Sequence, residues 1–173
     1  MYKLRRACGT DMYAIHRMIT DGRASLKSRG VDQWQDFFPG ERDFARDIAL
    51  AQLWVLTDDA NAPIAVAALC FGEDPSYRVI TEGDWLGSLP YAAIHRVAVS
   101  NGCKGRGVAG ILFRALCGIA RDSGCRTVRI DTHEDNASMR RALEKSGFAF
   151  RGRIRTTHGS PRVAYEKDLL ITK

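Results

Sequence analysis

A glycine-rich loop between an apolar strand and a helix is the feature that most constrains the fold of this chain. It runs VAVSNGCKGRGVAG over residues 97–110 and contains G-x-G-x-x-G at positions 105–110. The run 91–99 is strongly apolar, and helical spacing follows the loop. Small residues let the backbone approach a phosphate, and the first turn of a helix offers unpaired N–H groups. The loop therefore predicts a site for a phosphate-bearing cofactor.

The same glycine pattern occurs in NAD-binding folds, and Asp131 at the end of the next strand is compatible with that interpretation. In those folds, however, the strand runs almost directly into the first glycine, whereas residues 100–104 intervene here. Too little sequence follows to build a second mononucleotide-binding half. The alternative pattern Lys104-x-x-Gly107-x-Ala109 suits any pyrophosphate, including that of coenzyme A. A purely structural glycine turn is the other interpretation.

The remaining pattern predicts one domain over residues 1–173, with mixed α and β elements. Thr10 or Asp11 can cap a first helix over 12–20, and a second short helix over 22–30 stops at Gly30. The segment 72–90 is irregular. Further helices are expected over 41–51, 105–124 and 136–147, and strands over 2–7, 52–58, 63–71, 91–99, 126–132, 148–156 and 162–170.

Composition is that of an ordinary globular domain, with 45% hydrophobic and 27% charged residues. The five cysteines are scattered without C-x-x-C, which predicts reduced thiols in a cytoplasmic protein rather than disulfides or a zinc site. The N-terminus is too polar for a signal peptide, and the longest apolar run, 64–71, is too short to cross a membrane. The net charge of +6 suits a polyanionic partner, a nucleic acid or a phosphorylated cofactor, or simply a basic solvated surface.

A second motif follows the strand after the loop: Asn136-x-x-Met139, and then L-x-K-x-G-F over 143–148. With both motifs, the chain resembles the GNAT superfamily of acetyl-CoA-dependent N-acetyltransferases over about residues 91–165. In detail it is similar to a group of small bacterial GNAT proteins that carry W-Q, I-H-R-x-A-V, D-T-H-x-D-N and G-S-P-R. These motifs occur here at 34–35, 94–99, 131–136 and 159–162.

The resemblance implies an α+β fold, the GNAT acyl-CoA N-acyltransferase fold, in which helices flank a splayed, mostly antiparallel sheet. It also implies that the main chain of the central strand pairs with the pantetheine arm of acetyl-CoA, with an amide near Val99 facing the thioester carbonyl. No metal is expected, because adjacent residues such as those at 133–135 cannot all converge on one ion. The implied cofactor-binding residues are Val97, Ala98, Val99, Lys104, Gly105, Arg106, Gly107, Val108, Ala109, Gly110, Asn136, Met139 and Lys145.

Acetyl transfer needs a neutral amine, a stabilised tetrahedral intermediate and a thiolate that can leave. Many members of the superfamily place a tyrosine acid where this chain has Leu143, so the proton comes from solvent or from another group such as Tyr165. Some members carry a glutamate base where this chain has Ala93. We predict His95 as the base, because strand alternation puts it on the same face as positions 97 and 99 and its ordinary pKa is near 6.5. Glu82 is the alternative base, and a core histidine is the alternative role for His95.

Large aromatics and acids in irregular segments line pockets or attract cationic amines, although they also fill gaps or remain solvated. The predicted substrate residues are Trp34, Glu82, Trp85, Tyr91 and His133.

The function implied by the resemblance is direct transfer of an acetyl group, in a ternary complex, to a primary amine of a small molecule or peptide. A homodimer is a possible assembly, and neither nucleic acid nor membrane is expected as a partner. Two alternatives remain. Leu143 favours a module that binds acetyl-CoA without turnover, and the basic run 140–155 favours a nucleic-acid-binding protein.

Overall fold

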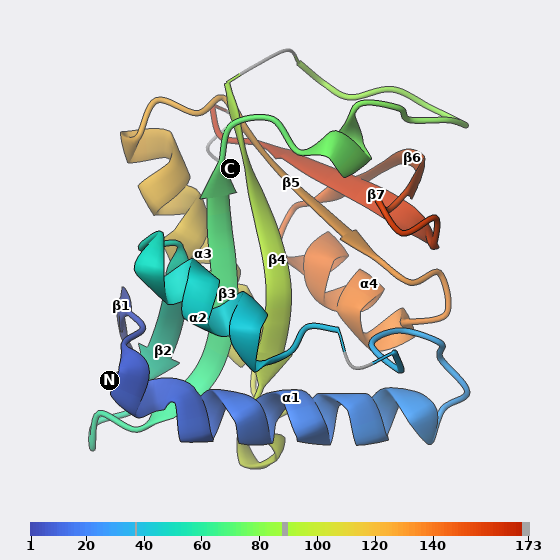
Figure 1. Cartoon of the computed structure of the whole chain (residues 1–173). Helices are drawn as coiled ribbons and strands as arrows, with labels where there is room; N and C mark the ends of the chain where they lie inside the picture. Colours follow the sequence, from blue (N-terminus) through green and yellow to red (C-terminus); the bar gives the residue numbers. More distant parts are fainter. Residues whose placement is uncertain (37, 88–89, 171–173) are drawn as a thin grey trace. The chain divides into compact units, whose positions relative to one another are not determined.

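The computed structural model describes residues 1–36, 38–87 and 90–170 (Figure 1). Its strands form one sheet with the order β1-β2-β3-β4-β5-β7-β6. The strands are β1 (Lys3–Arg6), β2 (Leu53–Thr57), β3 (Pro63–Phe71), β4 (Tyr91–Val99), β5 (Thr127–Thr132), β6 (Ala149–Arg155) and β7 (Pro161–Asp168). The helices are α1 (Met12–Lys27), α2 (Glu41–Ala49), α3 (Val108–Asp122) and α4 (Ala137–Lys145), with 3₁₀ turns η1 (Gly9–Asp11), η2 (Pro75–Tyr77) and η3 (Asn101–Cys103).

The pairing of the strands confirms the expected mixed, mostly antiparallel sheet. β2 pairs antiparallel with both β1 and β3, and β7 pairs antiparallel with both β5 and β6. β4 pairs with β5 in parallel. A parallel pair needs a crossover connection, which α3 supplies between these two strands.

The contacts divide the chain into two compact units, each considered by itself. The first comprises Met1–Leu69 and Arg96–Leu112, and the second comprises Cys70–His95 and Phe113–Lys173. A single functional domain over 1–173 therefore stays a prediction. Within the part of the chain that the structure describes, no helix is long and apolar enough to cross a membrane.

In the first unit, α1 is one helix, so the prediction of two helices separated near Gly22 is wrong. Its buried side chains, Ile15, Met18, Ile19 and Leu26, follow one helical face. A Cβ atom at position 22 would lie 3.3 Å from the ring of Trp34. The glycine in this helix thus makes room for an aromatic ring and does not end the helix.

In the second unit, the irregular segment after β3 packs against the sheet. Thr81 and Arg153 exchange backbone hydrogen bonds of 2.8 and 2.7 Å, which attaches the segment to β6. Beneath it lies a buried cluster that includes Tyr77 and Tyr91, against which Trp85 packs. The segment is irregular, as expected, apart from the short turn η2, and most of its described residues are exposed, but Tyr77 is buried in the core.

Candidate active site

The parallel pairing of β4 with β5 stops partway along β4. The registered pairs run from Tyr91 with Thr127 to Ile94 with Ile130, whereas β4 itself continues to Val99. Residues 97–99, whose main chain was predicted to bind pantetheine, therefore lie beyond the end of the β4–β5 ladder. Their side chains are largely buried, so the predicted binding role falls to their backbone groups.

A local backbone distortion lies just before this stretch. Arg96 has φ of 56°, in the left-handed region that non-glycine residues rarely occupy. A residue in this conformation inside a strand interrupts the alternation of side chains. Up to His95 the alternation holds, because Tyr91 and His95 both contact the ring of Tyr77. Beyond Arg96, strand alternation therefore no longer places the side chain of His95 on the same face as those of Val97 and Val99.

The glycine loop lies between η3 and the start of α3. Gly105 and Gly107 both have φ of 76°, and a Cβ atom at either position would meet nothing within 4 Å. Residues 104–107 are exposed, while Val108, the first residue of α3, is buried and anchors the helix start. Ala109 and Gly110 are half-buried. An open, positively polarised helix start preceded by left-handed glycines is suited to a pyrophosphate.

The predicted cofactor residues of the second unit lie on α4. Asn136 is the buried N-cap of this helix, and its Oδ1 accepts hydrogen bonds from the Met139 amide at 3.4 Å and the Ser138 hydroxyl at 3.1 Å. The sequence pattern predicted a capped helix in this segment, and the structure has one. Met139 is half-buried, and Lys145 is exposed in the last turn.

His95, the predicted base, contacts a carboxylate that the sequence analysis did not single out. Its Nε2 lies 2.8 Å from Oδ2 of Asp74, and the two side chains are 21% and 20% exposed. Burial opposes ionisation of Asp74, but the hydrogen bond and charge of His95, together with the Ser76 amide, lower the pKa of this carboxyl below its usual value. The sequence Asp74-Pro75 is a recognisable helix-start signal, but nothing local links it to His95.

Tyr77 and Asp131 extend the contacts around His95. The Tyr77 ring packs on the imidazole with centroids 5.8 Å apart, and its hydroxyl donates to Oδ1 of Asp131 at 2.8 Å. Burial, followed by the charge of Asp131, raises the pKa of Tyr77 well above its usual value. Arg162 lies 3.9 Å from the other oxygen of Asp131. Tyr77 thus stays a neutral donor near neutral pH.

Two of the predicted substrate residues, Trp85 and Tyr91, lie in the same region and are engaged in packing. The guanidinium of Arg129 lies between their rings, 4.3 Å from the Trp85 centroid and 3.9 Å from that of Tyr91. Arg129 also pairs with the buried Glu166 at 2.9 Å. Trp85 Nε1 donates to the Tyr77 carbonyl at 3.0 Å. These contacts show how both aromatics support the core of the second unit.

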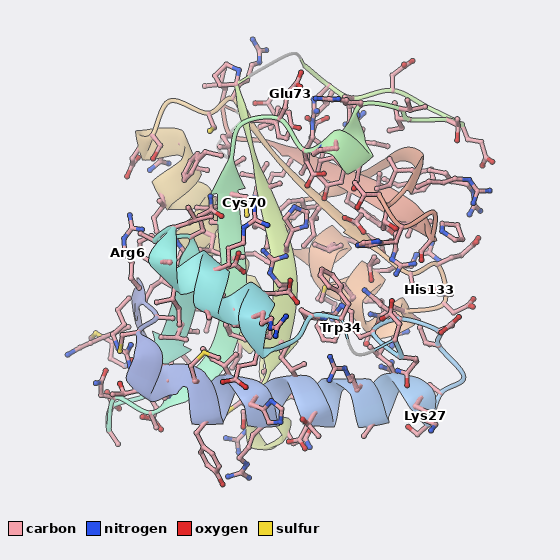
Figure 2. All side chains as sticks on the ribbon, viewed as in Figure 1. Arg6, Lys27, Trp34, Cys70, Glu73 and His133 are labelled. Carbon is pink, nitrogen blue, oxygen red and sulfur yellow. The ribbon has the colours of Figure 1, made fainter. Side chains whose placement is uncertain are left out.

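The other predicted substrate residues have different partners. Glu82 is exposed, and its carboxylate pairs with Arg153 at 2.9 Å. Arg153 also pairs with Glu134. His133 follows β5 and accepts a hydrogen bond from the Asp135 amide at 3.1 Å (Figure 2). Trp34 belongs to the first unit, where Arg23 donates to its carbonyl oxygen at 2.9 Å.

The two positions considered for a general acid are both occupied by packing. Leu143 is fully buried. Tyr165 is also buried; its hydroxyl accepts from Arg140 at 3.1 Å and lies 3.3 Å from Oε1 of Glu144. Among residues 1–36, 38–87 and 90–170, no group of three or more His, Cys, Asp or Glu side chains is placed to hold a metal ion.

The strand β4 thus continues beyond its parallel ladder and is followed by an exposed glycine loop and the helix α3. The model of the acetyltransferase (GNAT) family matches residues 13–148, and the chain belongs to this family.

Solved structures agree with this assignment. A GNAT-family acetyltransferase from Streptococcus agalactiae is 31% identical, with a TM-score of 0.89 over 99% of this chain and 96% of that one. One from Listeria monocytogenes is 21% identical, with a TM-score of 0.73 over 96% and 94%. A phosphinothricin acetyltransferase from Sinorhizobium meliloti, solved with AcCoA, is 18% identical, with a TM-score of 0.69 over 96% and 88%. No curated protein matches the chain.

Proposed function

We propose that this protein transfers the acetyl group of acetyl-CoA directly to a primary amine of a small molecule or peptide, within a ternary complex. The observation that carries the proposal is the end of β4. Its ladder with β5 stops at Ile94, and the chain then leads into the open glycine loop at the start of α3. The AcCoA present in the Sinorhizobium meliloti relative supports the same donor.

In this proposal the main chain of residues 97–99 pairs with the pantetheine arm. Amides of the loop 104–110 and of the first turn of α3 hold the pyrophosphate, because they offer N–H groups and the positive end of the helix dipole. An amide near Val99 faces the thioester oxygen, where negative charge develops as the tetrahedral intermediate forms. Asn136, Met139 and Lys145 contribute further contacts to the cofactor.

His95 is the proposed general base. An amine similar to lysine has a pKa of about 10.4 and must lose a proton before it attacks. His95 is partly exposed, and its Nε2 lies 2.8 Å from the Asp74 carboxylate. Coenzyme A's thiol, if it resembles cysteine with a pKa of about 8.5, leaves without a strong acid. A buried leucine at position 143 is therefore compatible with turnover.

Ligand-dependent stability tests the cofactor assignment. Acetyl-CoA at a hundred times its dissociation constant should raise the free energy of unfolding by about 2.7 kcal/mol, and NAD should not. Stabilisation by NAD without any by acetyl-CoA would overturn the proposal. Release of coenzyme A in the presence of a panel of primary amines then identifies the acceptor class.

A module that binds acetyl-CoA without turnover is the second candidate. Two observations favour it. Position 143 is a buried leucine, which cannot donate a proton. The hydroxyl of Tyr165 is already hydrogen-bonded to Arg140 and Glu144. Such a protein would be stabilised by acetyl-CoA but would release no coenzyme A with any amine. Binding to nucleic acid is not proposed, because Arg153 in the basic run is already paired with Glu82 and Glu134.

A further inference from the structure

The contact between His95 and Asp74 determines which nitrogen of the imidazole carries a proton. The Asp74 carboxylate can only accept a hydrogen bond when it is ionised, so the hydrogen between the two groups belongs to Nε2 of His95. In a neutral imidazole the lone pair is then on Nδ1. No described residue forms a hydrogen bond with Nδ1, and the side chain is partly exposed.

Asp74 is itself held in place by two further contacts. Its Oδ1 accepts from the Ser76 amide at 2.8 Å, as the N-cap of η2. Its own backbone N–H donates to the hydroxyl of Tyr91 at 2.7 Å. Tyr91 and His95 are both on β4, so the strand that carries the histidine also anchors the segment that carries its carboxylate.

The other polar groups around the imidazole do not compete for its proton. Tyr77 covers one side of the ring, and its hydroxyl is bonded to Asp131. Asp131 in turn faces Arg162. The groups that face His95, from η2, β4, β5 and β7, therefore leave Asp74 as its single hydrogen-bonding partner among the described residues.

We propose that Asp74 is a positioning residue, which keeps the proton of neutral His95 on Nε2 and so presents Nδ1 as the atom that deprotonates the acceptor amine. This inference rests on the proposed acetyltransferase function. Nδ1 takes one proton from the substrate ammonium, and the freed nitrogen attacks the thioester carbonyl. The C–N bond forms and the C–S bond breaks. The second amine proton passes to the departing thiolate, and the imidazolium, stabilised by Asp74, returns its proton to solvent.

Replacing Asp74 by asparagine reverses the direction of this hydrogen bond. The Asn oxygen can still accept from the Ser76 amide, since asparagine is also a good N-cap. Its NH₂ group then faces Nε2 and donates to it, which moves the proton of neutral His95 to Nδ1. The lone pair that receives the amine proton is lost, although the side chain keeps its shape.

The first measurement is the tautomer of His95 by ¹⁵N NMR, at a pH where the imidazole is neutral. The His95→Gln spectrum identifies the signal among the four histidines. We expect the wild type to be protonated on Nε2 and Asp74→Asn on Nδ1. A wild-type His95 protonated on Nδ1 overturns the proposal, and this readout requires no substrate.

The second measurement is kcat/KM against pH with acetyl-CoA and an accepted amine. Asp74→Asn should lower kcat/KM by about 10²–10⁴-fold, the range for loss of general-base catalysis, while acetyl-CoA binding stays unchanged. Glu73→Gln is the matched control (Figure 2), because the adjacent Glu73 is exposed and pairs at the surface with Arg78, at 3.1 Å. If Asp74→Asn and Glu73→Gln have the same kcat/KM and the same dependence of kcat/KM on pH, the proposal is overturned.

The two proposals fail in different ways. A wild type that binds no acetyl-CoA or releases no coenzyme A contradicts the proposed function, whatever the tautomer of His95. An active wild type whose rate is insensitive to Asp74→Asn, with His95 protonated on Nε2 in both proteins, contradicts the positioning role alone.

Discussion

Arg96 donates two hydrogen bonds to Asp47, from Nε to Oδ2 at 2.6 Å and from Nη2 to Oδ1 at 2.8 Å. Asp47 is buried on α2, and Arg96 is the left-handed residue of β4. A left-handed backbone costs a non-glycine residue roughly 1–2 kcal/mol. The two-fold ion pair offsets this strain and holds the backbone in the conformation from which residues 97–99 continue.

Removal of Asp47 should therefore destabilise the protein strongly. Asp47→Ala leaves the Arg96 guanidinium largely buried without its carboxylate, and we expect a loss of about 3–5 kcal/mol in the free energy of unfolding. Urea denaturation measures this loss. Asp122→Ala is the control, because its pair with Arg121 is exposed and should contribute less than about 1 kcal/mol. Equal losses in the two variants would show that the Arg96 pair does not stabilise the distortion.

Gly107→Glu should abolish stabilisation by acetyl-CoA. The carboxylate would lie where the pyrophosphate is proposed to bind, and repulsion between like charges would exclude the ligand. Gly118→Glu is the matched control, since that position is also open but lies about 16 Å further along α3. Thermal shift with acetyl-CoA compares the two. A folded Gly107→Glu protein that retains the full shift would exclude the proposed loop.

The attachment of the irregular segment to β6 depends on two glycines. A Cβ atom at Gly83 would lie 2.0 Å from the carbonyl oxygen of Arg151, and one at Gly152 would lie 2.5 Å from that of Thr81. Because backbone atoms cannot move aside, we expect either alanine variant to lose more than about 2 kcal/mol of unfolding free energy.

Gly72→Ala separates this clash from the cost of a left-handed backbone. Gly72 also has a positive φ, of 93°, but its Cβ would meet nothing within 4 Å. It should lose only about 1–2 kcal/mol in the same denaturation experiment. A Gly83→Ala protein no less stable than Gly72→Ala would contradict the close approach of the two segments.

Acid should weaken the contribution of Asp11 to stability. Arg5 binds its carboxylate through two hydrogen bonds of 2.7 and 2.8 Å, and this contact lowers the pKa of Asp11 below its usual value despite burial. A carboxyl whose pKa is depressed by folding stabilises the protein above its unfolded pKa, about 3.9, and loses that contribution as the pH falls through the folded value.

The difference in unfolding free energy between wild type and Asp11→Asn should therefore be largest above about pH 5 and shrink as the pH falls below about 4. Urea denaturation over this range measures it. The difference in unfolding free energy between wild type and Arg5→Met should depend on pH in a similar way, because this substitution removes the other partner of the ion pair. A difference independent of pH would exclude this linkage.

Local patterns predicted the backbone of the site well. The apolar run of β4, the helical spacing of α3 and the glycines between them are short-range signals, and the structure has these elements at the expected places. The two left-handed glycines, Gly105 and Gly107, are also local, because only glycine adopts that backbone conformation without cost. The same kind of reasoning divided α1 at Gly22 wrongly, since the ring of Trp34 that packs there comes from a distant part of the chain.

The sequence by itself thus determined the strands, the helices from α2 onward and the exposed glycine stretch before α3. Only the tertiary structure decided the neighbours of each side chain: Asp74 beside His95, Asp47 beside Arg96, and Arg129 between Trp85 and Tyr91. The physical reason is that helical and strand propensities act over a few residues. Contacts between side chains depend on strand register, on one left-handed residue in β4 and on the packing of an irregular segment, none of which has a periodic signature.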